Sequence, residues 1–122
     1  MYKFLSLIFC TLLCGLVAGC FPVFPNARSI DDLTAPVIIK LEAPSDPQKH
    51  VVSIQIRGIG AVDGAAQIEL MLNGSPYRTE KLAGPISFTW GGDWYSPTAE
   101  IRYRPINVKG GRLAIQYRFE TL

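Results

Sequence analysis

The sequence has few of the residues on which enzymes depend. Histidine occurs once in 122 residues, as His50, and the three cysteines all lie within the first twenty positions. No serine stands in a Gly-x-Ser-x-Gly motif, and no glycine-rich phosphate-binding motif is present. A Ser-His-Asp triad would need His50 as its base, but His50 follows the polar segment 45–49, where a solvated histidine is expected. We therefore expect a protein that is not an enzyme and that uses no cofactor.

Ligands for a metal ion are scarce as well. One histidine and no cysteine beyond position 20 do not supply an ordinary zinc site. Asp46, Asp63 and Asp93 lie in segments rich in turn residues, but none belongs to the dense aspartate run of a calcium-binding loop. We expect no metal and interpret these aspartates as solvated turn residues. The net charge of +2 also gives little reason to expect nucleic-acid binding.

The three cysteines belong to an apolar amino terminus. Residues 1–19 include 14 apolar side chains, and their single charge, Lys3, precedes an apolar run from Phe4 to Ala18. At 15 residues this run is shorter than the roughly 20 residues that a membrane-spanning helix needs. The pattern predicts a cleaved signal peptide over residues 1–19.

The end of this run, Leu16-Val17-Ala18-Gly19-Cys20, resembles the lipobox of bacterial lipoproteins. In that family the cysteine thiol receives a diacylglyceryl group, the peptide bond before the cysteine is cut, and the new amino group is acylated, with palmitate as an expected fatty acid. The resemblance implies that Cys20 becomes an S-diacylglyceryl, N-acyl cysteine that anchors the chain to a membrane. It implies a place in the bacterial cell envelope, and Phe21 after the cysteine implies the outer membrane. The alternatives are a secreted protein cut near Gly19 and an uncleaved helix.

Removal of residues 1–19 leaves 103 residues with no pair of cysteines, so no disulfide is expected. Residues 20–35 contain prolines and no regular period, which predicts a flexible tether of up to about 50 Å. Residues 36–122 are expected to form the folded domain.

From residue 36 onward, apolar and polar residues alternate with a period of two, and no window has a helical period. The dipeptide Asn73-Gly74 is a strong turn signal, after which Tyr77 to Leu82 is expected to return as a strand. About seven strands are predicted, each with one apolar face, which is typical of an antiparallel β-sandwich of the immunoglobulin-like or jelly-roll kind. The sequence does not give their connectivity. The residues expected to face the core in the other six strands are Val37, Ile39 and Leu41; Val52, Ile54 and Ile56; Ile68, Leu70 and Leu72; Ile86, Phe88 and Trp90; Ile101 and Tyr103; and Leu113, Ile115, Tyr117 and Phe119.

Large aromatic residues crowd the segment that follows Trp90. Trp90 continues an apolar strand face and is expected in the core, whereas Trp94 and Tyr95 fall in a loop beside Asp93. Exposed aromatics next to a carboxylate suit stacking on a sugar ring, and they equally suit a hot spot for a protein partner. The alternative is that both side chains fold back as a lid.

Arginines line the polar side of the last two predicted strands. Arg102 and Arg104 lie on one of these strands, and Arg112 and Arg118 lie on the other. If the two strands pair, the four guanidinium groups share one sheet face. A solvated face with cross-strand ion pairs is the favoured interpretation. The alternative is a surface for an anionic partner, such as an acidic protein, lipopolysaccharide phosphates or peptidoglycan carboxylates.

These observations favour an envelope lipoprotein whose non-enzymatic domain binds a protein partner in the periplasm or at the cell surface. Secretion-system or assembly accessories and immunity or inhibitor proteins are examples of this class. The alternative is a carbohydrate-binding or cell-wall-binding module that uses Trp94 and Tyr95. An exposed, coplanar pair of these side chains favours a glycan, and a pair folded into the core favours a protein.

Overall fold

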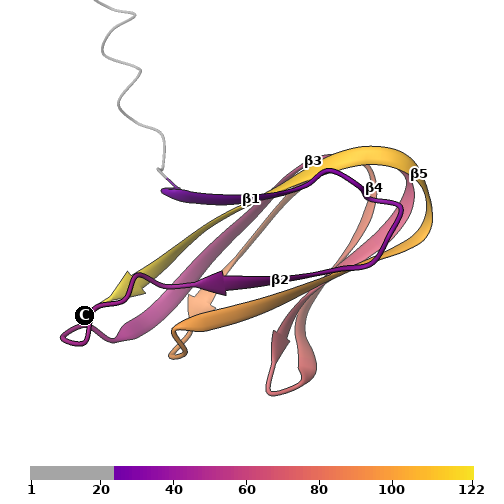
Figure 1. Ribbon diagram of the computed structural model, residues 1–122. Helices are drawn as coiled ribbons and strands as arrows, with labels where there is room; N and C mark the ends of the chain where they lie inside the picture. Colours follow the sequence, from indigo (N-terminus) through magenta and orange to yellow (C-terminus); the bar gives the residue numbers. More distant parts are fainter. Residues whose placement is uncertain (1–23) are drawn as a thin grey trace, which may run out of the picture.

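The computed structural model describes residues 24–122, which are entirely β-structure and loops (Figure 1). All strand pairs in this range are antiparallel: β5 pairs with β1, β2 and β3, and β3 also pairs with β4. No helix in residues 24–122 is long and apolar enough to cross a membrane. The predicted signal peptide and lipobox lie outside the described residues. The strands in this range are β1 (Asn26–Ile30), β2 (Val37–Glu42), β3 (Val51–Leu72), β4 (Ser75–Asp93) and β5 (Thr98–Thr121).

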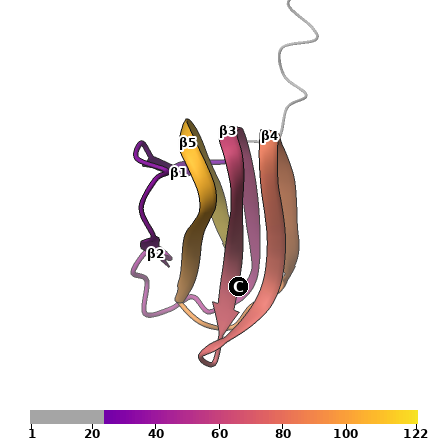
Figure 2. The same cartoon turned by 90° about the vertical axis from the view of Figure 1, so that its right-hand side faces the viewer.

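The strands β3, β4 and β5 bend, so that each one runs through both layers of a sandwich (Figure 2). The first half of β3 pairs with the second halves of β4 and β5, and its second half pairs with their first halves. Register shifts mark the bend of β3 near Gly64, which has a φ of 122°. A Cβ atom at Gly64 would overlap the carbonyl oxygen of Asn107, so the bend requires glycine. A second positive-φ glycine, Gly84, lies at the bend of β4.

The two short strands belong to opposite layers. β1 pairs with the second half of β5, between Leu113 and Tyr117, and β2 pairs with the first half, between Thr98 and Tyr103. We call these the β1 layer and the β2 layer. The predicted antiparallel β-sandwich is confirmed, and the seven predicted strands correspond to β2 and to the two halves of β3, β4 and β5.

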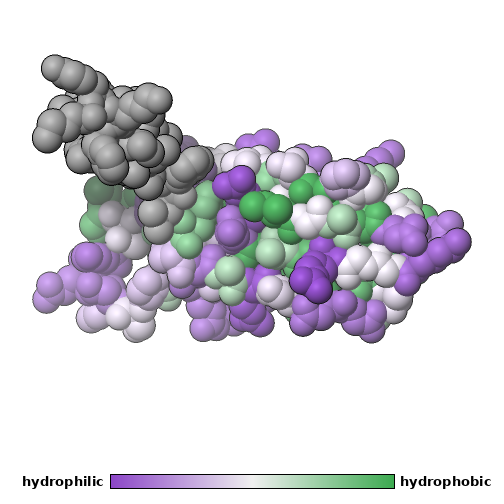
Figure 3. Space-filling view, turned by 90° about the horizontal axis from the view of Figure 1, so that it is seen from above, coloured by the Kyte–Doolittle hydropathy of each residue, from purple (hydrophilic) through white to green (hydrophobic). Residues whose placement is uncertain are grey.

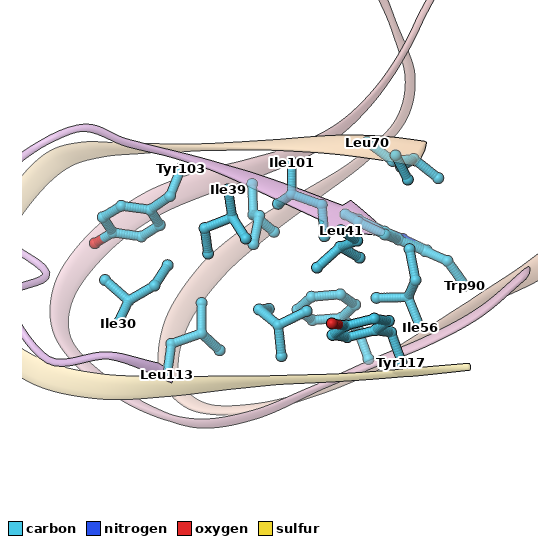
Figure 4. Packing of buried hydrophobic residues seen from close by; sticks show 14 of the residues in the cluster. Ile30, Ile39, Leu41, Ile56, Leu70, Trp90, Ile101, Tyr103, Leu113 and Tyr117 are labelled. Carbon is cyan, nitrogen blue, oxygen red and sulfur yellow. The ribbon is translucent and has the colours of Figure 1, made fainter. Parts of the chain in front are cut away.

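The core lies between the layers, where side chains from the β1 layer meet those from the β2 layer (Figure 4). Two predicted core positions are wrong by one residue, because register shifts interrupt the alternation. Val51 is buried in place of Val52, and Met71 is buried while Leu72 is 39% exposed. The shifts lie between Val51 and Ser53 and between Leu70 and Met71. The largest fully buried side chains are Tyr103, Leu33, Leu41, Ile56, Ile68, Leu70, Ile101, Leu113 and Ile115.

The predicted tether is wrong for residues 26–35, because this segment belongs to the folded domain. β1 pairs residue by residue with β5, and both Ile30 and Leu33 are buried. The hydroxyl of Tyr103 donates a hydrogen bond to the carbonyl oxygen of Leu33 at 2.7 Å, which fixes the chain between β1 and β2. Burial, with a smaller contribution from the negative charge of Asp32, raises the pKa of Tyr103.

Candidate functional site

The structure separates the two loop aromatics that the sequence predicts as a pair. Trp94 is 5% exposed: its indole Nε1 donates to the carbonyl oxygen of Thr98 at 3.0 Å, and its backbone N–H donates to Val52 at 3.1 Å. Tyr95, the next residue, is 75% exposed. Trp94 therefore closes one end of the core, as in the fold-back alternative, and the two side chains do not form an exposed, coplanar pair.

Tyr95 borders a hollow at the end of the sandwich where the C-terminus lies (Figure 1). The hollow has a volume of about 540 Å³ and is walled by the connection between β2 and β3, by the connection between β4 and β5, and by the end of β5. We call it the Tyr95 hollow. Its remaining lining residues are Glu42, Ala43, Pro44, Ser45, Asp46, Pro47, Lys49, His50, Val51, Pro97, Thr98 and Thr121.

Backbone hydrogen bonds hold the wall of the Tyr95 hollow in place. The N–H of Ala43 donates to the carbonyl oxygen of Pro97 at 2.8 Å, which ties the two connections together. His50 and Leu122 exchange two backbone hydrogen bonds of 2.9 Å each. Within the loop, Asp46 Oδ1 accepts the N–H of Gln48 at 2.9 Å in a turn typical of aspartate. The hollow is thus formed by the fold itself and needs no ligand to shape it.

The side chains around Tyr95 combine groups of both charges. Glu42 and Asp46 carry carboxylates, Lys49 carries an amine, and His50 adds an imidazole. The sequence predicts His50 as a solvated residue, and the structure places it, exposed, in the lining of the Tyr95 hollow. The sequence did not place Asp46, Lys49 and His50 near Tyr95, because the pairing of β2 with β5 and of β3 with β4 brings their loop there.

Asp93 does not lie at the Tyr95 hollow. It lines a separate small hollow on the β4 side of the sandwich, together with Tyr77, Arg78 and Trp94. Tyr77 on β4 is 49% exposed, and its ring lies 6.4 Å from that of Trp94. The guanidinium of Arg78 lies over the Tyr77 ring at 5.1 Å.

The condition under which the four arginines would share one face, pairing of their two segments, is not met. All four lie on β5, whose two halves belong to opposite layers and pair with β1, β2 and β3 but not with each other. Arg102 pairs with Glu100 at 3.0 Å, Arg118 pairs with Glu120 at 3.1 Å, and Arg104 pairs with Glu69. Hydrophilic and hydrophobic residues are interspersed over the face shown in Figure 3. The favoured interpretation, solvated arginines in ion pairs, describes Arg102 and Arg118, and each of these pairs lies within one strand.

Clusters of metal-binding residues are absent from the described part of the chain. No group of three or more His, Cys, Asp or Glu residues within positions 24–122 is placed to hold a metal ion.

Comparisons with known proteins give likenesses of fold at low identity. No family model matches the chain, and no curated protein matches it. A solved structure described as "CBM4 structure and function" matches at 10% identity and a TM-score of 0.44, over 82% of this chain and 74% of that one. The carbohydrate-binding module CBM36, in complex with calcium and xylotriose, matches at 13% identity and a TM-score of 0.37, over 77% and 78% of the two chains. The sugar-binding C-terminal domain of EclA matches at 14% identity and a TM-score of 0.38, over 84% of each chain.

Proposed function

We propose that this chain is a non-enzymatic, lipid-anchored binding domain of the bacterial cell envelope, and that the Tyr95 hollow binds a glycan. The observation that carries this proposal is the 75% exposure of Tyr95 at the edge of a hollow that the fold itself forms and that polar and apolar residues line together. A sugar ring has an apolar face that stacks on an aromatic ring and a rim of hydroxyl groups that need hydrogen-bond partners. Tyr95 supplies the ring, and Asp46, Lys49 and His50 supply the partners.

The size and charge of the hollow agree with a short, uncharged glycan segment. Its volume of about 540 Å³ lies within the range of roughly 300–1,000 Å³ that small-molecule sites occupy. The carboxylates of Glu42 and Asp46 offset the positive charge of Lys49, so the lining does not select a strongly anionic ligand. The hydroxyl groups of a glycan can donate hydrogen bonds to the carboxylates and accept hydrogen bonds from the amine.

Glycan retention tests the proposal. Wild-type protein and the variant Tyr95→Ala are passed over immobilised peptidoglycan and over a panel of neutral polysaccharides. Loss of the stacking ring is expected to weaken retention by about tenfold, the equivalent of about 1.4 kcal/mol. The control is Ile106→Ala, which removes another exposed apolar side chain (68% exposed) that does not line the hollow and should leave retention unchanged. Equal retention of the wild type and Tyr95→Ala contradicts the proposed site.

A protein partner in the periplasm or at the cell surface remains the second candidate. It is favoured by an open groove of about 700 Å³ between the edges of β1 and β2, where Ile38 is 65% exposed beside Arg28 and Lys40. An extended segment of another protein fits such a groove, as a secretion-system accessory or an immunity protein would require. Capture of the same protein by the wild type and by Tyr95→Ala, with no glycan retained by either, would favour this candidate.

A further inference from the structure

One side of the sandwich is formed by β4 alone. Within residues 24–122, β4 pairs with β3 only, so its other edge bears no strand in either layer. Figure 2 shows β4 at one side of the molecule, running along both layers. The rim of each layer on this side is therefore a free strand edge, whose backbone N–H and C=O groups can pair with a further strand.

One segment of this free edge, residues 86–92 in the β1 layer, lacks the charges and prolines that usually protect edge strands. By comparison, β1 carries Arg28, and β2 carries Lys40 and Glu42. Charged residues on edge strands discourage the addition of another strand, and their absence permits it.

The side chains of this segment leave room for an added strand. Ile86, Phe88 and Trp90 point into the core and are at most 9% exposed, while the exposed side chains between them, Ser87 and Thr89, are small. An added strand would therefore bind through backbone hydrogen bonds at the edge, because the apolar side chains of the segment are already buried in the core.

Charged side chains of both signs flank the segment. Arg78 lines the same hollow as Trp90, Gly91 and Asp93, and Glu80 lines the same hollow as Lys81, Ile86 and Phe88. Neither Arg78 nor Glu80 forms an ion pair within residues 24–122. Each hollow therefore contains one positive and one negative side chain: Arg78 with Asp93 on one side of Thr89, and Glu80 with Lys81 on the other.

We propose that this rim pairs with a second copy of the chain, antiparallel, about a two-fold axis at Thr89. This register places Phe88 of one copy opposite Trp90 of the other, and Ser87 opposite Gly91. The axis also exchanges the two hollows, so Arg78 of each copy meets Glu80 of the other. The two contacts between Arg78 and Glu80 across the axis favour a second copy over a strand from another protein, and a two-fold contact of this kind closes on a dimer.

Site-specific crosslinking of the full-length protein in membranes tests the dimer. Cross-strand Cβ atoms in an antiparallel pair lie about 4.5–5.5 Å apart, close enough for a disulfide after a small shift. Thr89→Cys is therefore expected to give, on mild oxidation, a product of twice the mass in a non-reducing gel. The control is Ala27→Cys, an exposed position on the opposite edge strand, which should give no product beyond that of the wild type. No added crosslink from Thr89→Cys, or a crosslink to a different protein, overturns the proposal.

Charge reversal tests the register and also controls for folding. Starting from Thr89→Cys, Arg78→Glu and Glu80→Arg are each expected to reduce the dimer product several-fold, because each places like charges together. The double reversal restores the opposite-charge pairs and is expected to restore the product. If the two single reversals leave the yield unchanged, the proposed register is overturned.

Discussion

At the scale of single residues, Glu69 is the charged side chain that the described fold buries. Glu69 lies between the core residues Ile68 and Leu70, so the alternation of the strand points its side chain away from the core. It is nevertheless only 3% exposed. Arg104 forms an ion pair with it, and Gln67 donates to its Oε1 at 2.9 Å. A carboxylate removed from water depends on these partners, because an unpaired buried charge is strongly destabilising.

We predict that Arg104→Ala lowers the free energy of unfolding by about 2 kcal/mol, since it leaves Glu69 with one weaker partner. The matched control is Arg102→Ala on the same strand. Arg102 and Glu100 are both more than 40% exposed, and a solvated pair of this kind contributes at most about 0.5 kcal/mol. Urea denaturation measures both variants, and equal losses would contradict the special role of Glu69.

The sequence does not predict which of the neighbours Trp94 and Tyr95 is buried. Both are large aromatic residues in the same loop, and either one could be exposed or buried. The burial of Trp94 depends on the carbonyl oxygens of Val52 and Thr98, of which Val52 is distant in the chain. A pattern of local residues carries no information about such a partner, so the site could be predicted only as far as Tyr95 itself.

At the scale of the strands, alternation predicted the segments but not their continuity. Residues 60–66 and 83–85 contain the glycines and prolines of expected loops, yet they continue the β3 and β4 ladders through a bend. β1 was missed for a different reason, because only its last residue, Ile30, contributes to the core. Its strand conformation is imposed by the free edge of β5, which is a long-range effect.

We predict that Ile30→Ala lowers the free energy of unfolding by about 3 kcal/mol, because Ile30 is 4% exposed and its removal leaves a cavity. Ile38→Ala on β2 is the matched control: this isoleucine is 65% exposed, and its truncation is expected to change stability by less than about 0.5 kcal/mol. Thermal unfolding followed by circular dichroism compares the two. A negligible loss for Ile30→Ala would mean that residues 26–30 behave as a tether after all.

At the scale of the whole molecule, the start of the domain at Asn26 changes the expected distance to the membrane. If Cys20 carries the lipid, the residues between the anchor and β1 span at most about 20 Å, at roughly 3.3 Å per residue. The predicted tether of residues 20–35 allowed about 50 Å. An anchor at Cys20 would therefore hold the domain close to the lipid surface.

We predict that Cys20→Ser abolishes acylation and moves the protein from the membrane fraction to the soluble fraction. Two or three acyl chains anchor a protein stably, and no other residue would carry them. Labelling with a palmitate analogue, followed by fractionation, measures both effects. Cys14→Ser, in the expected signal peptide, is the control and should keep the label. Persistent labelling of Cys20→Ser would refute the proposed lipoprotein anchor.

Most strand pairs of the sandwich involve β5, so they cannot form before β5 has been synthesised. β5 pairs with β1, β2 and β3, and its last paired residue, Thr121, lies opposite Val51. Only the β3–β4 hairpin can close before β5 has been made, because its strands are joined by the short turn at Asn73-Gly74. Pairing between such distant segments is slow to nucleate. The sandwich is therefore completed only when β5 is available, and until then the growing chain stays largely open.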